Sequence, residues 1–202
     1  MLLTEEDQNF LKVKIKFLII ILTLLFTSKS YCEKIVLEKL VELDSPWGSS
    51  FINNNEIIVT EKSGKIKIVD ILTNQIQEVD HQLDFVVHGQ GGLLDIIHKD
   101  NIVWISYTED RGNYKTSTSI ARAKLNKKKL VFKNIFQANP PIDSGYHFGS
   151  RLAIKDNYIY ASAGERGQGM IAQDASKHPG SIIRVHLDAV SYTHLRAHET
   201  KS

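Results

Sequence analysis

Cysteine is almost absent from this sequence, since Cys32 is the only one among 202 residues. A single cysteine excludes an intramolecular disulfide and cannot anchor a thiol mechanism. An excess of charge of one sign is also missing, because 25 lysines and arginines stand against 23 aspartates and glutamates. Such a balance produces no field that would recruit nucleic acid. We therefore expect no nucleic-acid partner, and we expect Cys32 to be a free thiol.

The common metal and nucleophile motifs are missing as well. Five histidines show no H-x-H or H-E-x-x-H spacing, and we interpret them as surface or strand residues rather than metal ligands: His81, His88, His98, His178 and His186. No nucleophile elbow is present. The glycines at 89–92 are followed by neither Gly-Lys-Ser/Thr nor a helix, which excludes a phosphate loop.

The N-terminal region has the pattern of an export signal. Three lysines between residues 12 and 16 precede a mainly apolar run over 17–26, and small residues follow before Tyr31. The run is about half of the roughly 20 residues needed to span a bilayer. We therefore predict a cleaved signal peptide with an upstream extension over 1–30, and a periplasmic or secreted mature protein. Its membrane contact would be limited to the signal.

Short β-rich segments make up the chain after Tyr31, where no helical periodicity lasts for more than about two turns. Alternation and β-branched composition predict strands at 56–60, 65–68, 102–107, 119–125, 130–132, 158–163 and 181–185. The predicted fold class is all-β.

A weak internal repeat refines this class. The segments 55–60, 101–106 and 157–162 each begin with Asn, continue with apolar residues and end with a hydroxyl, at Thr60, Ser106 and Ser162. Repeats at this interval, about 40–50 residues, are typical of β-propeller blades. A chain of this length cannot close a propeller ring, so we predict a partial β-propeller over 31–188.

The last residues, 189–202, continue no strand pattern and resemble the translation of an adapter used in sequencing libraries. We expect them to be a non-native tail. The natural sequence would then continue beyond Asp188 in a longer gene.

Three segments carry candidate chemistry. Pro46-Trp47-Gly48 predicts the start of a strand with a buried tryptophan packed in a blade. Around Gln90, the glycines at 89, 91 and 92 permit close approach of a flat ligand, or form a structural turn. His147 lies in a glycine-containing loop, where an imidazole can take a proton from an alcohol or can bond its own loop. Glu165 follows one predicted strand later.

Taken in order, these segments resemble the glucose/sorbosone dehydrogenase family of soluble aldose sugar dehydrogenases. The resemblance runs from about Leu43 to Arg184 and rests on these motifs: Pro-Trp-Gly at 46–48, Thr-Glu-x-x-Gly at 60–64, Gly-Gln-Gly-Gly-Leu-Leu-Asp at 89–95, His-Phe-Gly-Ser-Arg-Leu at 147–152, Gly-Glu-Arg at 164–166, Ala-Gln-Asp at 172–174 and His-x-Gly-x-Ile-x-Arg at 178–184.

The resemblance implies a six-bladed β-propeller that binds pyrroloquinoline quinone over its central channel, with calcium orienting the quinone. It implies that His147 is the general base for the anomeric hydroxyl, and that hydride passes to the quinone as an aldose becomes a lactone. Gln90 and Glu165 would contact cofactor or substrate, and Arg151 would be a structural anchor. Export implies a downstream electron acceptor outside the cytoplasm.

The sequence departs from the family pattern in two ways. Tyr146 stands where relatives usually carry Asn or Asp. The later family segments, including the calcium ligands, are missing, so we expect the chain as given not to bind the cofactor properly or turn over. The alternative is a non-catalytic exported propeller that binds a carbohydrate or protein partner. A calcium-dependent propeller lactonase would need clustered Asn, Asp and Glu side chains, and the sequence shows no such cluster.

Overall fold

The computed structural model describes residues 10, 12, 14–19, 35–188 and 195–196 of the chain. They belong to two compact units, Met1–Glu38 and Lys39–Ser202. In the first unit, residues 14–19 are helical. The predicted cleavage site and Cys32 lie outside the described residues, so the signal-peptide prediction stays a prediction. None of the helices described is both long enough and apolar enough to cross a membrane.

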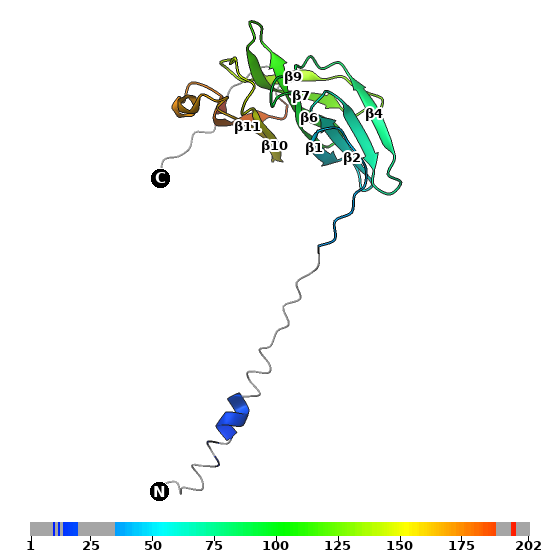
Figure 1. The fold of residues 1–202 in the computed structure, drawn as a ribbon, viewed down its shortest axis with the longest axis vertical. Helices are drawn as coiled ribbons and strands as arrows, with labels where there is room; N and C mark the ends of the chain where they lie inside the picture. Colours follow the sequence, from blue (N-terminus) through cyan, green and yellow to red (C-terminus); the bar gives the residue numbers. More distant parts are fainter. Residues whose placement is uncertain (1–9, 11, 13, 20–34, 189–194, 197–202) are drawn as a thin grey trace. The chain divides into compact units, whose positions relative to one another are not determined.

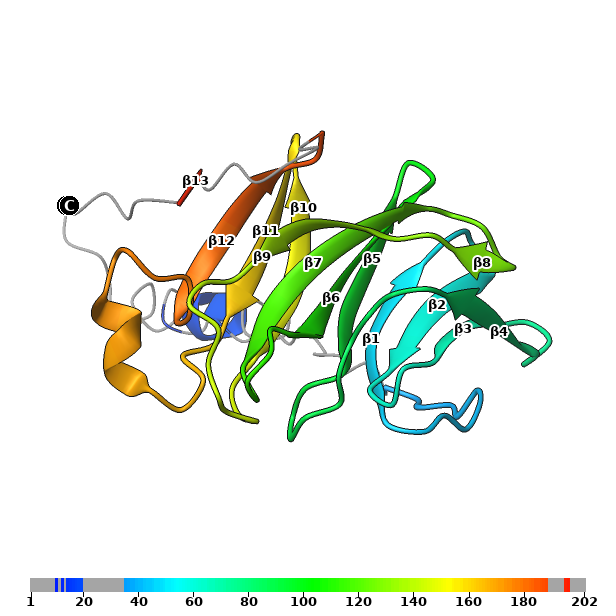
Figure 2. The same cartoon turned by 90° about the horizontal axis from the view of Figure 1, so that it is seen from above.

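The second unit consists of three β-sheets, each built mainly from antiparallel neighbours (Figures 1 and 2). Blade 1 contains β1 (Pro46–Phe51), β2 (Glu56–Glu61), β3 (Ile66–Asp70) and β4 (Ile76–His81). Blade 2 contains β5 (Leu93–Lys99), β6 (Ile102–Asp110), β7 (Thr116–Lys124) and β9 (Lys133–Gln137). Blade 3 contains β10 (Gly149–Lys155), β11 (Tyr158–Ala163), β12 (Ser181–His186) and β13 (Leu195–Arg196). The predicted all-β class is confirmed.

Two short elements lie outside this plan. The strand β8 (Lys129–Leu130) leaves blade 2 and pairs in parallel with β4, which ties the two blades together at their outer edge. The 3₁₀ helix η1 (Gly169–Gln173) lies between β11 and β12. The two-residue strand β13 pairs with β12 but falls in the predicted tail, whose origin it does not test.

The blades pack face to face, and the first strand of blade 2, β5, contacts the first strands of both neighbours. One apolar core fills the junction of blades 1 and 2, and its largest members are Ile58, Ile66, Ile68, Leu93, Ile96, Ile105, Tyr107, Leu130 and Phe132. A second core fills the junction of blades 2 and 3, with Trp104, Ile120, Ile135, Phe136, Leu152, Ile159, Ile183 and Val185. Because β6 contributes to both cores, it is buried on both faces, which explains why its sequence is apolar without alternation.

The predicted repeat marks the same place in every blade. Thr60, Ser106 and Ser162 lie on the second strand, opposite an irregularity in the register of the first strand. In each blade the hydroxyl accepts a backbone N–H from that irregular stretch at 2.9 to 3.1 Å, from Gly48, Asp95 and Arg151 respectively. The hydroxyl therefore satisfies a donor that the irregular strand pairing leaves without a carbonyl.

Two of these hydroxyls also bridge to the next blade. The Thr60 Oγ1 donates to the Leu94 carbonyl at 2.5 Å, and the Ser106 Oγ donates to the Ser150 carbonyl at 2.7 Å. A hydroxyl can accept and donate at once, so one small side chain fixes its own strand and positions the following blade.

The structure corrects two expectations. Trp47 is not buried, since 41% of it is exposed. Gly48 faces β5, and because successive residues of a strand point to opposite sides, its neighbour Trp47 points away from β5. The strand predicted at 130–132 is also wrong. Its first residue ends β8, and the chain pairs again only from Lys133, as β9.

Candidate functional site

The three predicted site residues lie on loops at one end of the blades. Gln90 lies between β4 and β5, His147 between β9 and β10, and Glu165 between β11 and β12. In antiparallel blades, the loops that enter the first strand and the loops that join the second strand to the third emerge at the same end. We call this end, formed by the loops 82–92, 111–115, 138–148 and 164–180, the site face.

The structure brings Gln90 and His147 together. The backbone N–H of Gln90 donates to the Gly145 carbonyl at 2.7 Å, and the backbone N–H of His147 donates to the Gln90 Oε1 at 2.9 Å. Gly89 has φ +56°, and a Cβ there would lie 2.4 Å from the Gly145 oxygen. Glycine is therefore required for the two loops to approach, which is the physical basis of the motif around Gln90.

Glu165 holds the imidazole of His147. Its Oε1 contacts the His147 Nδ1 and also accepts the backbone N–H of Gly167 at 3.1 Å. The hydrogen bond from His147 is the main cause that lowers the pKa of Glu165, so the carboxylate is ionised near neutral pH. A carboxylate is an acceptor, so in the neutral form of the imidazole Nδ1 carries the proton and Nε2 bears the lone pair.

The reactive side of this histidine is open. The His147 side chain is 53% exposed, and its Nε2 forms no hydrogen bond within the described part of the chain. Its backbone adopts φ +47°, uncommon for a residue with a side chain, and a Cβ on Gly164 would lie 1.9 Å from the His147 carbonyl oxygen. The site can therefore accept a proton at Nε2 from a group that approaches from solvent.

Arg166 belongs to the Gly-Glu-Arg motif at 164–166, but the sequence predicts no role for it. It is 3% exposed and lies over the Phe148 ring, 3.6 Å from the ring centroid. Burial lowers its pKa to about 10, which leaves the guanidinium charged at neutral pH. Arginine is normally exposed, so its burial was not expected from the sequence. The one feature that could have drawn attention to Arg166 is its position beside Glu165 in a Gly-x-x-Gly segment.

Arg151 lies apart from the imidazole. Its Nη1 pairs with the Asp95 Oδ1 at 3.0 Å, and its side chain is 72% exposed. The buried Asp95 also accepts the backbone N–H of Leu152 at 2.7 Å through Oδ2. Arg151 therefore contacts Asp95 and not His147, and the structural role expected for it stays a prediction.

The chain matches the family model described as Glucose / Sorbosone dehydrogenase over residues 43–193. The chain belongs to the glucose/sorbosone dehydrogenase family. The resemblance recognised from the motifs is therefore confirmed.

Relatives in the glucose/sorbosone dehydrogenase family are longer. Aldose sugar dehydrogenase YliI of Escherichia coli strain K12 is 29% identical over 154 residues, which cover 71% of this chain and 42% of that protein. The soluble aldose sugar dehydrogenase of E. coli, solved in the apo-form, aligns with a TM-score of 0.69 and 28% identity over 73% of this chain and 45% of that one. The PQQ-bound aldose sugar dehydrogenase of Streptomyces coelicolor aligns with a TM-score of 0.67 and 25% identity over 77% and 48%. The chain thus spans less than half the length of these relatives, and its β-propeller architecture is confirmed.

The donors on the site face are chemically suited to carbonyl and carboxylate oxygens, the groups that a quinone cofactor carries. The Gln90 Nε2 has no partner within the described residues and can donate to a carbonyl or carboxylate. Lys62 lies beside it, with its Nζ 2.5 Å from the Gly89 carbonyl, and supplies positive charge. No group of three or more His, Cys, Asp or Glu side chains in the described ranges could hold a metal ion.

Three of the remaining histidines make local contacts. The His81 Nε2 lies 2.7 Å from the Gly64 carbonyl, and the Nδ1 atoms of His178 and His186 accept the backbone N–H groups of Asn139 and Asp188.

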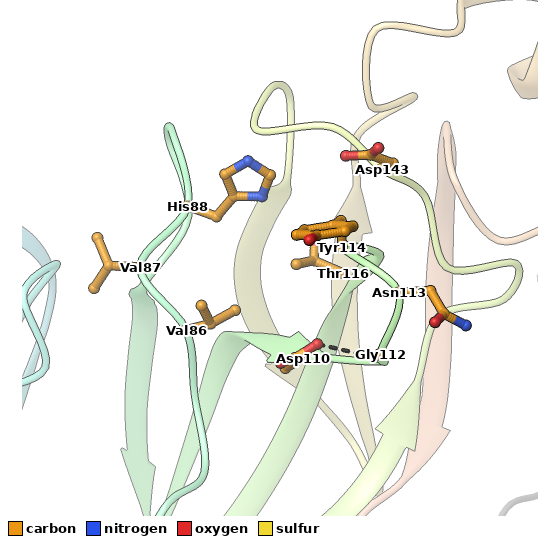
Figure 3. A pocket seen from close by; sticks show the side chains of 9 residues that line it. All are labelled: Val86, Val87, His88, Asp110, Gly112, Asn113, Tyr114, Thr116 and Asp143. Atoms are coloured by element: carbon orange, nitrogen blue, oxygen red, sulfur yellow. Dashed lines mark hydrogen bonds between the residues drawn. The ribbon is translucent and has the colours of Figure 1, made fainter.

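A pocket of about 710 Å³ lies on the site face (Figure 3). It is lined by Val86, Val87, His88, Asp110, Gly112, Asn113, Tyr114, Thr116 and Asp143. His88 precedes Gln90 by two residues and Asp143 precedes His147 by four, whereas Gln90, His147 and Glu165 themselves do not line the pocket. The exposed Tyr114 on the β6–β7 hairpin adds an aromatic face.

Proposed function

We propose that this chain carries the proton-accepting part of the active site of an exported, quinone-dependent aldose sugar dehydrogenase. The observation that carries the proposal is the His147–Glu165 pair. The Nδ1 of His147 contacts a carboxylate oxygen, its backbone N–H donates to Gln90, and its side chain is 53% exposed, with no hydrogen bond at Nε2 within the described residues. Membership of the glucose/sorbosone dehydrogenase family supports the reaction class.

In the proposed reaction, the His147 Nε2 accepts the proton of the anomeric hydroxyl as the C1–H bond breaks and the aldose becomes its lactone. Glu165 stabilises the resulting imidazolium through Nδ1, and Gln90 keeps the loop of His147 in place while its free amide binds cofactor or sugar. The adjoining pocket offers an aromatic ring and a few polar groups, a composition suited to a small polar ligand. Pyrroloquinoline quinone, when bound, supplies the acceptor for the hydride.

The wider setting belongs to the same proposal. Calcium would be bound by residues beyond those described, and electrons would pass to a downstream acceptor outside the cytoplasm. The basic and apolar pattern at the N-terminus supports export to the periplasm or an equivalent space.

The test uses a gene product that extends to the length of the relatives. With an aldose present, it should reduce a dye only when both the quinone and calcium are supplied. His147→Gln should lower kcat by about 10²–10⁴-fold because it removes the proton acceptor. His98→Gln is the matched control, since His98 lies near the opposite end of β5.

Retention of wild-type kcat by His147→Gln would overturn the assigned role. Failure of the wild-type protein to reduce the dye, combined with measurable sugar or protein binding, would favour the non-catalytic propeller.

A further inference from the structure

The Arg166 guanidinium bonds to two separate segments of the site face. It donates to the Tyr146 carbonyl through Nε at 2.9 Å and to the Ser144 carbonyl through Nη2. It also donates to the Thr116 carbonyl at 3.1 Å and to the Thr116 Oγ1 at 2.8 Å. One side chain thereby fastens the loop that carries His147 to the first residue of β7, in the neighbouring blade.

These contacts act on the residues that flank His147. Tyr146, immediately before it, is held through its carbonyl, and the ring of Phe148, immediately after it, packs under the guanidinium. The backbone of His147 lies in the left-handed region, which a residue with a side chain occupies only when its surroundings hold it there. Arg166 contributes to those surroundings on both sides, through Tyr146 and through Phe148.

Arginine at this buried position meets acceptors that other side chains could not satisfy. No carboxylate in the described part of the chain pairs with Arg166, so its buried charge is compensated only by carbonyls, a hydroxyl and an aromatic face. Burying an arginine without an acid is costly, and an apolar side chain would fill the same space more cheaply. The planar fork of guanidinium donors can satisfy several acceptors in fixed directions, which neither an apolar residue nor lysine can do.

We propose that Arg166 is a positioning residue that fixes the backbone of His147, so that Glu165 and Gln90 meet it in one geometry. Glu165 orients the imidazole and the adjacent Arg166 orients the main chain, so two consecutive residues control both parts of the proposed base. The effect on turnover rests on the proposed function, whereas the effect on imidazole geometry does not.

The geometric test is ¹⁵N NMR of the imidazole of His147 in the 202-residue chain. The wild-type chain should show the Nδ1–H tautomer. Arg166→Met should give a mixture of tautomers, because the loop no longer presents Nδ1 to Glu165. Arg122→Met is the matched control. Arg122 also donates to a backbone carbonyl of blade 3, that of Leu187, but at the end opposite the site face, so its loss should leave the imidazole signals unchanged.

The kinetic test uses the longer gene product. Arg166→Met should lower kcat by about a hundredfold while KM changes by less than about threefold, because misplacement of a base by about 1 Å affects turnover more than binding. Arg166→Lys, which keeps the charge and loses the fork, should lower kcat by about tenfold. Arg122→Met should lower the Tm without this loss of kcat.

Unchanged imidazole signals and kcat in Arg166→Met would overturn the proposal, whatever happens to its Tm. If Arg166→Met does not fold, the proposal is tested with Arg166→Lys and Thr116→Val instead. Thr116→Val removes only the Oγ1 acceptor of Arg166. Unchanged imidazole signals in both variants would refute the proposal. A wild-type gene product without quinone-dependent activity would refute the proposed function, while the NMR result would still decide whether Arg166 positions His147.

Discussion

The junction between blades 1 and 2 and the junction between blades 2 and 3 are built alike but serve different ends. Each has an apolar core and a hydroxyl bridge, from Thr60 in the first and from Ser106 in the second. At the second junction, further polar bonds reach the chain that follows His147: the Thr118 Oγ1 donates to the Phe148 carbonyl at 2.9 Å, and Asp95 accepts from Leu152.

The added bonds at the second junction converge on residues 144–152, on both sides of the proposed base. The first junction also has further polar bonds between blades, such as those from the His98 N–H to the Ser50 Oγ at 3.0 Å and from the Leu93 N–H to the Lys62 carbonyl at 3.3 Å. The second junction differs in where its polar bonds lie, since they surround the loop that carries His147. A repeated scaffold can therefore hold a candidate site at one junction without a change in the fold.

The largest expected effect in this comparison comes from Asp95. Asp95→Ala should lower the free energy of unfolding by about 3 kcal/mol, because the buried N–H groups of Leu152 and Ile96 lose their acceptor. Arg151→Met should cost no more than about 0.5 kcal/mol, because the Arg151 side chain is largely exposed and its ion pair is screened. Urea unfolding of both variants gives the two values. Equal losses would show that the ion pair, rather than the hydrogen bonds that Asp95 accepts from backbone N–H groups, stabilises the second junction.

A smaller effect is expected from the hydroxyl bridges. Thr60→Val and Ser106→Ala should each cost about 1.5 kcal/mol, because each leaves a buried N–H and the carbonyl of the next blade unpaired. Ser162→Ala should cost about 0.5 kcal/mol, because its hydroxyl accepts from Arg151 and donates to no residue described here. Thermal unfolding at one pH compares the three variants. A cost at Ser162 as large as at Ser106 would mean that the bond within the blade, and not the bridge between blades, carries the energy.

The sequence was sufficient to predict the strands that combine β-branched residues with clear ends, such as β2, β6 and β11. It also indicated the repeat at Thr60, Ser106 and Ser162, although not that these hydroxyls bridge blades. The strand β5 escaped prediction because it is buried on both faces over most of its length, and its start was interpreted as part of a glycine loop. Trp47 was misplaced because burial depends on what packs against each face of a strand, which the sequence of that strand does not contain.

The candidate site could likewise be predicted only in part. Gln90, His147 and Glu165 were identified by resemblance, and the glycines around Gln90 indicated a close approach of loops. The contact of Glu165 with the His147 Nδ1 and the burial of Arg166 depend on residues from different blades and loops meeting in space. No local pattern encodes such meetings, so they emerge only from the three-dimensional structure.

The smallest expected effect is the pH dependence conferred by Glu165, whose contact with His147 joins two loops of the site face and should leave both apolar cores intact. The pKa of Glu165 is lowered in the folded chain, first by the hydrogen bond from His147, so the unfolded chain binds the proton more readily. This carboxylate therefore contributes stability above pH 4.5, its ordinary value, and loses it as the pH falls through the lower folded value. The difference in unfolding free energy between wild type and Glu165→Gln should shrink between about pH 6 and pH 3. It should be small throughout, since the side chain is 29% exposed.

The control is His147→Gln. In its background, the effect of Glu165→Gln on the unfolding free energy should no longer depend on pH, because the main cause that lowers the pKa of Glu165 is gone. A difference between wild type and Glu165→Gln that stays constant with pH would show that the contact with His147 does not hold Glu165 in its ionised form.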